Sequence, residues 1–391
     1  MTRIAFTTPL PPQATGVAAY SVRLLAALRD LVEVDVYVDG PPHQRDAIVH
    51  PAAPDGLTVR PLGALARVEA FAGAYDAVVY SLGNSEFHTG SLASLLRRRG
   101  IVLAHDVRLS NLYRFAQWQH PAVVAPGQLD AAAARMYGDA VSFEQVERWG
   151  LAMAREAIGA STRFLTTSTF AANLARLDAR PGDRDRIASV GFAMGTSPLD
   201  DPTPPLERPG PPVVASFGVV NRSKQGPLLV EAFAAAAPGD ARLVFVGPAG
   251  AEDRAAIARR ADDVGIGSRV EVCGEVDAAV YARWLDRAWL AVQLRASTNG
   301  ESSAAIGDCL AAGLPTIVTG IGANRELPSG AVAAVAPDVD AFDLASVIRG
   351  VLGSRDRRQA MGMAAAAHAA SRSFARAAQD LYEVVVSSSS R

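Results

Sequence analysis

The chain has 391 residues, of which 49% are hydrophobic and 20% charged, and its formal net charge is −2 with a pI near 6.3. This balance argues against disorder and gives no electrostatic case for nucleic-acid binding, which calls for a basic surface. The length exceeds what one hydrophobic core usually covers, so two domains are expected.

The expected location is the cytoplasm, with membrane contact that is at most peripheral. The start, MTRIAFTTPL, lacks a long apolar segment, and no run of 18 apolar residues follows. Arg97, Arg98 and Arg99 close an apolar helical segment, where the helix dipole favours cations, and such a run is a weak membrane signal by itself. Cys273 and Cys309, the only cysteines, lie in apolar contexts that suit reduced thiols.

The first half of the chain alternates short apolar strands with helical patterns. Strands are predicted at 3–7, 32–38, 76–80 and 100–106, a helix at 18–31, and a long Ala-rich helical stretch at 129–160. Polar residues follow several strands. Gly16 opens a helix after the first strand, Asn84 and His88 follow the third, and His105 and Asp106 close the fourth.

Repeated prolines between 197 and 212 forbid both helix and central strand, and they predict a linker. After it, six apolar segments alternate with stretches of helix length: VVASFG, RLVFVG, RVEVCG, LAVQLR, PTIVTG and AVAAVA. We therefore predict an α/β protein with two doubly wound, Rossmann-like domains facing a cleft, with ligands at the carboxyl ends of the strands. The expected parts are residues 1–200, a linker at 201–212, a second domain at 213–370, and a C-terminal helix with a Ser-rich tail at 371–391, the helix packing back on the first domain.

Lys224 is the only lysine among 38 basic residues. It follows the strand 213–217 and Gly218, just before a helix expected near Pro227. A compact ammonium beside a helix N-terminus favours an anion, because free backbone N–H groups and the helix dipole also favour negative charge there. A solvated lysine left by composition is the alternative.

A second polar segment, ASTNGESSAAIGDCLAAGLPTIV, follows the strand that ends at Leu294 and Arg295. Ser302 or Ser303 can cap a helix that ends near Gly313. If that helix extends back to Glu301, then Glu301 and Asp308 lie on one face of it, nearly two turns apart. A capping carboxylate and a solvated Asp308 are the simpler alternative.

Several enzyme classes are not supported. No G-x-G-x-x-G segment or Walker A loop follows a strand, and no Cys or His spacing indicates a metal site. Asp183 and Asp185 form an Asp-x-Asp sequence, but it follows Pro-Gly in a charged loop, which is typical of a solvated turn.

Together, the Gly-x5-Lys loop, the GPAG and VEVCGEV segments and the acidic helix ending in AAGLPTIVTG resemble the C-terminal domain of retaining GT-B glycosyltransferases, in particular glycosyltransferase family 4 (glycosyl transferases group 1). The resemblance covers roughly 213–327 well and the first half loosely. It implies a retaining, metal-independent, hexosyltransferase-like enzyme that needs no cofactor. Its substrates would be a nucleotide-diphosphate sugar, a UDP-sugar by default, and a small-molecule or glycan acceptor.

In the second domain, the resemblance assigns Gly218 and Lys224 to the donor diphosphate. The family arginine after the glycine is Val219 here, and Arg222 is a candidate to supply that charge. Arg295 is a second candidate diphosphate contact, with a structural ion pair as the alternative.

The acidic motif of the family maps less directly. Asp308 matches its second carboxylate and would receive ribose hydroxyls. The first position falls on Gly300 unless a one-residue gap brings in Glu301, which would then be the sugar-side carboxylate. The backbone N–H groups from Gly300 through Ser302 to Ser303 are candidates for the pyrophosphate.

In the first domain, His105 matches the family histidine at the reaction centre, and Gly16 the glycine near the donor. Asn84, His88 and Asp106 are expected on the acceptor or sugar side, with a structural role for His88 as the alternative. The catalytic set is therefore His105, Lys224 and Glu301. A nucleotide-sugar 2-epimerase of the same fold and a non-catalytic nucleotide-sugar-binding protein stay open.

Overall fold

The computed structural model describes residues 2–39, 54–195 and 210–389. The chain divides into two compact units. Unit 1 comprises Met1–Phe192, Asn299–Ser302 and Phe374–Arg391, and unit 2 comprises Ala193–Thr298 and Ser303–Ser373. Most of the predicted linker at 201–212 lies outside the described residues. The prediction of an α/β protein with two parallel-sheet, Rossmann-like domains is confirmed.

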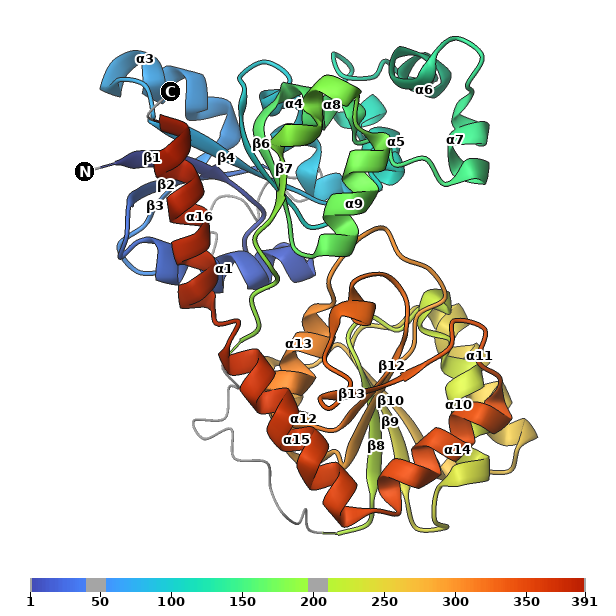
Figure 1. Ribbon diagram of the computed structural model, residues 1–391. Coiled ribbons are helices and arrows are strands. Elements are labelled where there is room, and N and C mark those ends of the chain that lie inside the picture. The colour runs from blue at the N-terminus through green and yellow to red at the C-terminus, as the bar shows by residue number, and fades with distance from the viewer. Residues whose placement is uncertain (1, 40–53, 196–209, 390–391) are drawn as a thin grey trace. The chain divides into compact units, whose positions relative to one another are not determined.

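Unit 1 contains a parallel sheet of seven strands in the order β3-β2-β1-β4-β5-β6-β7 (Figure 1). Its strands are β1 (Arg3–Thr7), β2 (Glu33–Val38), β3 (Thr58–Pro61), β4 (Ala77–Leu82), β5 (Gly100–Ala104), β6 (Ser161–Thr166) and β7 (Ile187–Ser189). Its helices are α1 (Gly16–Leu28), α3 (Leu65–Ala72), α4 (Thr89–Leu95), α5 (Ser110–Gln119), α6 (Leu129–Tyr137), α7 (Phe143–Trp149), α8 (Arg155–Ala160), α9 (Thr169–Asp178) and α16 (Phe374–Ser389), with 3-10 turns at η2 (Leu62–Ala64), η3 (Glu86–His88) and η4 (Pro181–Arg186). The C-terminal helix α16 packs on α1.

The Ala-rich stretch at 129–160 is not one long helix. It forms the three short helices α6, α7 and α8. Gly138 and Gly150 end the first two of them with φ angles of 100° and 63°. Glycine adopts such positive φ angles at no steric cost, so each glycine ends its helix and divides the stretch.

Unit 2 contains a parallel sheet of six strands in the order β10-β9-β8-β11-β12-β13. Its strands are β8 (Val213–Phe217), β9 (Arg242–Val246), β10 (Val270–Gly274), β11 (Leu290–Gln293), β12 (Thr316–Thr319) and β13 (Val332–Val335). Its helices are α10 (Gly226–Ala236), α11 (Ala251–Asp263), α12 (Ala278–Arg287), α13 (Ala304–Ala311), α14 (Ala341–Leu352) and α15 (Arg355–Ala370), with 3-10 turns at η5 (Arg222–Lys224), η6 (Gly267–Arg269) and η7 (Gly322–Glu326).

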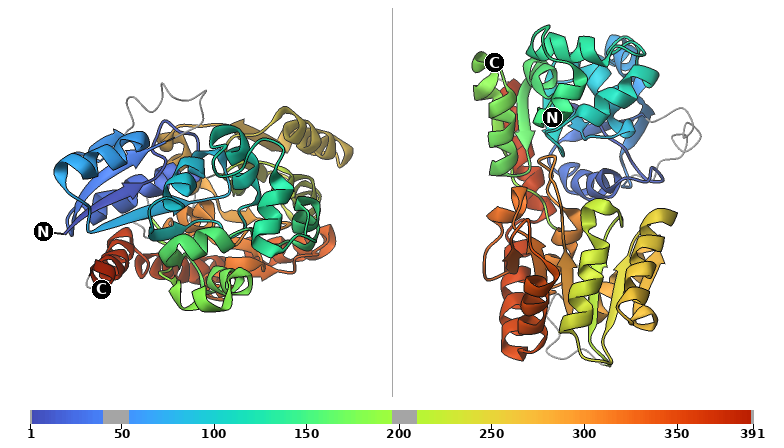
Figure 2. Two further views of the ribbon diagram at one scale, coloured as in Figure 1. Left: turned by 90° about the horizontal axis from the view of Figure 1, so that it is seen from above. Right: turned by 90° about the vertical axis from the view of Figure 1, so that its right-hand side faces the viewer.

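The apolar runs of unit 2 follow from burial of both faces of the sheet. Val213, Ala215 and Phe217 of β8 pack in a cluster with α12 and α13, whereas Val214 packs in a second cluster with α10, α11 and α14. Figures 1 and 2 show helices on both sides of this sheet. Successive side chains of a strand point to opposite faces, so a strand covered on both faces is mostly apolar; in β8 the exception is the buried Ser216.

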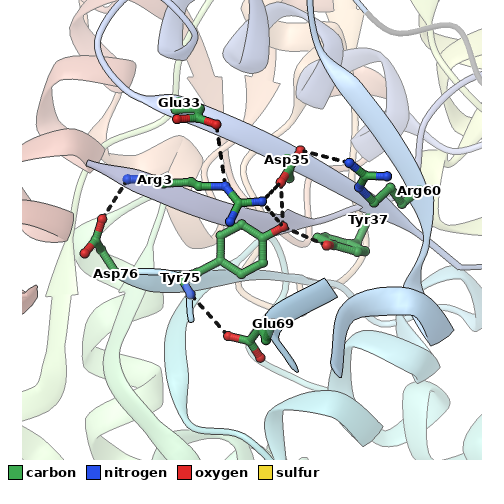
Figure 3. A network of polar contacts seen from close by, with 8 residues as sticks. All are labelled: Arg3, Glu33, Asp35, Tyr37, Arg60, Glu69, Tyr75 and Asp76. Carbon is green, nitrogen blue, oxygen red and sulfur yellow. Dashed lines mark hydrogen bonds and ion pairs between the residues drawn. The ribbon is translucent and has the colours of Figure 1, made fainter. Parts of the chain in front are cut away.

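A buried polar network lies at the amino ends of β1, β2 and β4 in unit 1 (Figure 3). The Asp35 carboxylate, which is 6% exposed, accepts hydrogen bonds from Arg3 Nη2 at 2.6 Å and from Tyr75 Oη at 2.5 Å. The Tyr37 and Tyr75 hydroxyls are 2.7 Å apart, and Arg60 is 4.0 Å from the second Asp35 oxygen. Burial, together with the hydrogen bond to Asp35, raises the pKa of Tyr75. This network holds three strands together at the end of the sheet opposite to the expected site.

Candidate functional site

In unit 2, neighbouring strands end in glycines whose backbones pack closely. Gly218 follows β8 with a φ of 90°, and Gly247 follows β9 with a φ of 147°. A Cβ at Gly247 would stand 2.3 Å from the Gly218 carbonyl oxygen, and Gly218 N donates to Val246 O at 3.0 Å. Because no side chain fits between them, the carboxyl edge of this sheet exposes backbone rather than side chains.

We call residues 218–226 the lysine loop. Two backbone hydrogen bonds fix this loop to neighbouring segments. Val220 N donates to Pro248 O at 2.8 Å, and Ser223 O accepts from Ala296 N at 2.9 Å. Gln225 has a φ of 51°, in the left-handed region, and leads directly into α10. The conformation of the lysine loop is therefore defined by backbone hydrogen bonds, and it fixes the position of the Lys224 backbone.

Lys224 is half-buried, and its ammonium has only weak contacts. Nζ is 3.5 Å from the Phe217 carbonyl oxygen, and among the described residues it forms no ion pair with a carboxylate. Burial, followed by the charge of Arg295, lowers the pKa of Lys224 to about 8. A cation that is buried without a counter-charge favours an added anion.

Gly218 brings this ammonium together with the first turn of α13. A Cβ at Gly218 would stand 3.4 Å from the Ala305 Cβ and 4.0 Å from Lys224 Nζ. Ser303 is the N-cap of α13, and its hydroxyl accepts from Ile306 N at 3.4 Å. A helix N-terminus and an ammonium that border one glycine both favour negative charge at that place.

Asp308 lies inside α13, in the same unit as Lys224. Its carboxylate accepts a hydrogen bond from the Tyr281 hydroxyl of α12 at 3.2 Å, and the Tyr281 ring packs edge-on against Phe217. Tyr281 therefore orients the carboxylate that the sequence assigns to ribose hydroxyls. No sequence pattern singles out Tyr281, because it lies in an ordinary amphipathic helix and only the fold brings it to Asp308.

Glu301 is not on the helix that carries Asp308, so the expectation of two carboxylates on one helical face is wrong. The helix α13 begins at Ala304, after the Ser303 cap. The Glu301 carboxylate instead accepts a hydrogen bond from Asn299 N at 2.6 Å, within its own loop. Gly300, with a φ of 91°, bends the chain there and separates this loop from the helix.

We call residues 299–302 the acidic loop, and it belongs to unit 1. Asn299 O accepts from Val107 N at 2.8 Å and from Arg108 N at 2.9 Å, in the segment after β5. The hydroxyls of Ser302 and Thr167 are 3.0 Å apart, just after β6. The acidic loop is thus bound to the carboxyl edge of the unit 1 sheet, beside two strands.

The two histidines of that edge are buried and neutral. The His88 Nδ1 atom donates to Ser81 O at 3.0 Å, and burial lowers the pKa of His88 to about 4. Burial and the neighbouring His88 lower the pKa of His105 to about 3. Their rings are 6.5 Å apart. Neutral imidazoles can accept as well as donate a hydrogen bond near pH 7, so this edge suits the handling of a hydroxyl group.

Asn84 and Asp106 are bonded to each other at the same edge. Asn84 N donates to Asp106 Oδ2 at 2.8 Å, and Asn84 Oδ1 accepts from Leu112 N at 3.1 Å. A Cβ at Gly83 would stand 2.8 Å from His88 Nε2 and 3.2 Å from Asp106 Oδ2. The glycine therefore allows His88 and Asp106 to approach the same stretch of backbone.

The first turn of α1 is open around Gly16. A Cβ at Gly16 would have no heavy atom within 4 Å, and Thr15 caps the helix by accepting from Val17 N at 3.4 Å. Neither crowding nor a positive φ requires glycine here. Open space beside a helix N-terminus is compatible with the predicted approach of a ligand.

The predicted residues divide between the units. Unit 1 holds Gly16, Asn84, His88, His105, Asp106, Gly300, Glu301 and Ser302, whereas unit 2 holds Gly218, Arg222, Lys224, Arg295, Ser303 and Asp308. Arg222 is exposed, and Arg295 N donates to Thr319 Oγ1 at 2.9 Å. Gly247 and Thr167 were not among the residues predicted from the sequence. A glycine that recurs at the ends of VVASFG, RLVFVG and RVEVCG was the available signal for Gly247.

Other features have structural roles in the described chain. Arg98 pairs with Glu69 at 2.6 Å, and Arg99 donates to Gly159 O and Ser161 O at the end of α8. Asp183 pairs with Arg186 in η4.

Within residues 2–39, 54–195 and 210–389, no group of three or more His, Cys, Asp or Glu side chains could hold a metal ion. No helix in these ranges is long and apolar enough to cross a membrane.

Residues 211–354 match the model of the family described as Glycosyl transferases group 1, in agreement with the resemblance of the motifs. Among solved structures, sucrose-phosphate synthase from Thermosynechococcus elongatus aligns with a TM-score of 0.69 at 19% identity, over 98% of each chain. HepE of Anabaena in complex with UDP-glucose aligns with a TM-score of 0.67 at 16% identity, over 99% of this chain and 100% of that one.

WaaG, a glycosyltransferase involved in lipopolysaccharide biosynthesis, aligns with a TM-score of 0.63 at 14% identity, over 98% of this chain and 99% of that one. Comparison with curated protein sequences finds no match. The chain therefore has the GT-B fold, and residues 211–354 are similar to the glycosyl transferases group 1 family.

Proposed function

We propose that this chain of GT-B fold is a retaining family 4 glycosyltransferase that moves a hexose-like sugar from a nucleotide-diphosphate donor to a small-molecule or glycan acceptor. A UDP-sugar is the default donor, and the solved complex of HepE with UDP-glucose supports that choice. The proposed reaction needs neither a metal ion nor a cofactor. The proposed location is the cytoplasm, with membrane contact that is at most peripheral.

The observation that carries the proposal is the environment of Lys224. Its ammonium is half-buried beside the first turn of α13, near the like charge of Arg295, and without a carboxylate partner among the described residues. This arrangement stabilises an anion in the position where a diphosphate leaving group gains charge. Preorganised positive groups at such a position lower the barrier to departure, and they remove the need for a metal ion.

The remaining donor contacts follow from the same unit and from the acidic loop. Asp308, oriented by Tyr281, would accept hydrogen bonds from the ribose hydroxyls. The backbone N–H groups at Ser303 and in the acidic loop are candidates for the pyrophosphate. Glu301 would face the transferred sugar, in a loop that is anchored on unit 1.

The acceptor is assigned to unit 1. Neutral His105 can hydrogen-bond an acceptor or sugar hydroxyl, and Asn84, His88 and Asp106 surround it on the same edge. Retention of configuration requires attack from the face that the diphosphate leaves. We propose that the departing diphosphate takes the acceptor proton, so that the protein mainly positions the two substrates and stabilises leaving-group charge.

The test is turnover of a panel of UDP-, GDP- and dTDP-sugars, followed by NMR of the anomeric proton of the product. We expect donor hydrolysis or transfer with at least one nucleotide class, an unchanged anomeric configuration, and full activity in the presence of a metal chelator. Only inverted product, or an absolute requirement for a divalent ion, would contradict the mechanism. A free sugar with inverted C2 would identify the epimerase, and binding without turnover would identify a non-catalytic protein.

A further inference from the structure

Tyr20 of α1 is surrounded by three aromatic rings within unit 1. Its own side chain is buried, with 7% exposure. The centroid of its ring lies 5.2 Å from that of His105 in an edge-on arrangement, 5.1 Å from that of Phe192 in a stacked one, and 5.0 Å from that of Phe374. Pairs of this geometry are attractive beyond their buried area, so the four rings form one packed group.

Two of these rings lie at two of the four places where the chain passes between the units. The first segment of unit 1 ends at Phe192, and its last segment begins at Phe374, the first residue of α16. Directly beyond these residues, Met194 N donates to Arg372 O at 2.8 Å. Each of these two connections therefore contributes a phenylalanine ring that packs against Tyr20. The backbones of the two connections are also hydrogen-bonded to each other.

The fourth ring, His105, depends on packing for its orientation. Its Nε2 atom is buried and has no hydrogen-bond partner among the described residues. The backbone is fixed, because His105 N donates to Leu82 O at 2.7 Å. With Nε2 unbonded, the neighbouring rings of Tyr20 and His88 limit the rotation of the imidazole.

We infer that Tyr20 is a positioning residue for His105, held by Phe192 and Phe374 at two of the four connections between the units. A change in the backbone of either connection shifts its phenylalanine, and Tyr20 passes that shift to the imidazole. The inference rests on the proposed function in one respect, namely that His105 lies at the reaction centre. The packing of the four rings does not depend on that assignment.

Kinetics of Tyr20 variants test the catalytic part. Tyr20→Leu should lower kcat by roughly ten- to hundredfold, because small misplacements of a reacting group have effects of that size. The affinity of Tyr20→Leu for UDP should stay within about twofold of the wild-type value. Lys224 and Gly218 lie in unit 2, and the substitution removes an interaction that acts on His105 during the reaction. Tyr20→Phe keeps the ring and should restore kcat. The matched control is Tyr75→Leu, which removes another buried tyrosine of unit 1 away from His105 and should leave kcat per folded molecule unchanged.

NMR of the histidine side chains tests the coupling without any turnover. The His105 signal is identified by its loss in His105→Gln. Phe374→Leu and Phe192→Leu should each move the His105 signal when Tyr20 is present, and should no longer move it in the Tyr20→Leu background. The structure gives His88 no ring contact with Tyr20, so its signal should move less and serves as the internal reference.

The inference is overturned if the two phenylalanine variants leave the His105 signal in place, or move it equally with and without Tyr20. It is also overturned if Tyr20→Phe lowers kcat as much as Tyr20→Leu does. Failure of the wild-type protein to turn over any nucleotide sugar would instead refute the proposed function, and the NMR comparison would still decide whether Tyr20 couples the connections to His105.

Discussion

Each unit contains a cluster of charged side chains, and the two clusters differ in whether the charge has a partner of opposite sign. In unit 1, the Asp35 carboxylate meets Arg3 at 2.6 Å and the Tyr75 hydroxyl at 2.5 Å (Figure 3). In unit 2, the Lys224 ammonium lies 3.5 Å from a carbonyl oxygen and near a second cation, Arg295. The first cluster lies at the amino ends of its strands and the second at the carboxyl ends. The contrast fits a structural role for the first cluster and, for the second, supports the proposed contact of Lys224 with a diphosphate.

The largest expected effect concerns the paired cluster and is on stability. Asp35→Asn leaves the Arg3 guanidinium and the Tyr75 hydroxyl without the carboxylate that both contact, and breaking a buried pair costs about 3 to 5 kcal/mol. Urea unfolding should show this loss, with kcat per folded molecule unchanged. The contrast between the clusters would be wrong if Asp35→Asn had wild-type stability. It would also be wrong if the variant folded well and were inactive.

The unpaired cluster should show the reverse behaviour. Lys224→Arg keeps the charge but replaces a compact ammonium with a planar fork, and turnover should fall by roughly a hundredfold or more, as when a preorganised donor is removed. The melting temperature should hardly change. Arg259→Lys, the reverse exchange at an exposed position of α11 in the same unit, is the matched control and should stay near wild-type activity. Equal activities of wild type and Lys224→Arg would make the lone lysine an accident of composition.

A pair of glycine substitutions compares the predicted ligand edges of the two units. Gly218→Ala introduces a side chain at a φ of 90°, which costs about 1 to 3 kcal/mol of strain, and it should weaken nucleotide binding. Gly16→Ala meets no atom within 4 Å and needs no unusual φ, so its effect on stability should stay within about 0.5 kcal/mol. Unfolding and UDP titration of both variants measure the difference. Equal stability losses would show that the backbone at Gly218 is not constrained.

The smallest expected effect is a pH dependence of stability. Because the pKa of Lys224 is lowered to about 8 in the folded chain, the unfolded chain binds more protons between about pH 8 and the usual lysine pKa near 10.4. The ammonium therefore opposes folding below pH 8, and this opposition fades as the pH rises through that window. Lys224→Met should melt above wild type at pH 7, with a difference that closes toward pH 10. A difference that is constant or widens with pH would contradict the burial of this cation.

The sequence predicts the fold of unit 2 more completely than its site. The strand at Val213–Phe217 and the helix near Pro227 are confirmed, because burial on both faces makes the strand mostly apolar and the proline marks the helix start. The place of Glu301 could not be predicted. A glycine one residue before it bends the chain, and the hydrogen bonds of Asn299 to Val107 and Arg108 cross a long distance in the sequence.

In unit 1, the residues that follow the strands were predictable, but their partners were not. His105 and Asp106 follow a clear strand, so their place at the carboxyl edge of the sheet follows from the alternation of strands and helices along the chain. The contact of Tyr20 with His105 depends on how α1 packs, and the return of Phe374 depends on a helix at the other end of the chain. Such contacts carry no local sequence signal.

The central claim, that Lys224 marks the position of a diphosphate, is tested most directly by calorimetric titration of UDP and of uridine into the wild type and Lys224→Met. We expect UDP to bind the wild type, uridine to bind far more weakly, and Lys224→Met to lose most of the difference between them. At a hundred times its dissociation constant, UDP should also stabilise the wild type by about 2.7 kcal/mol. Equal binding of UDP to both proteins, or no binding of UDP, GDP or dTDP to the wild type, would contradict the account.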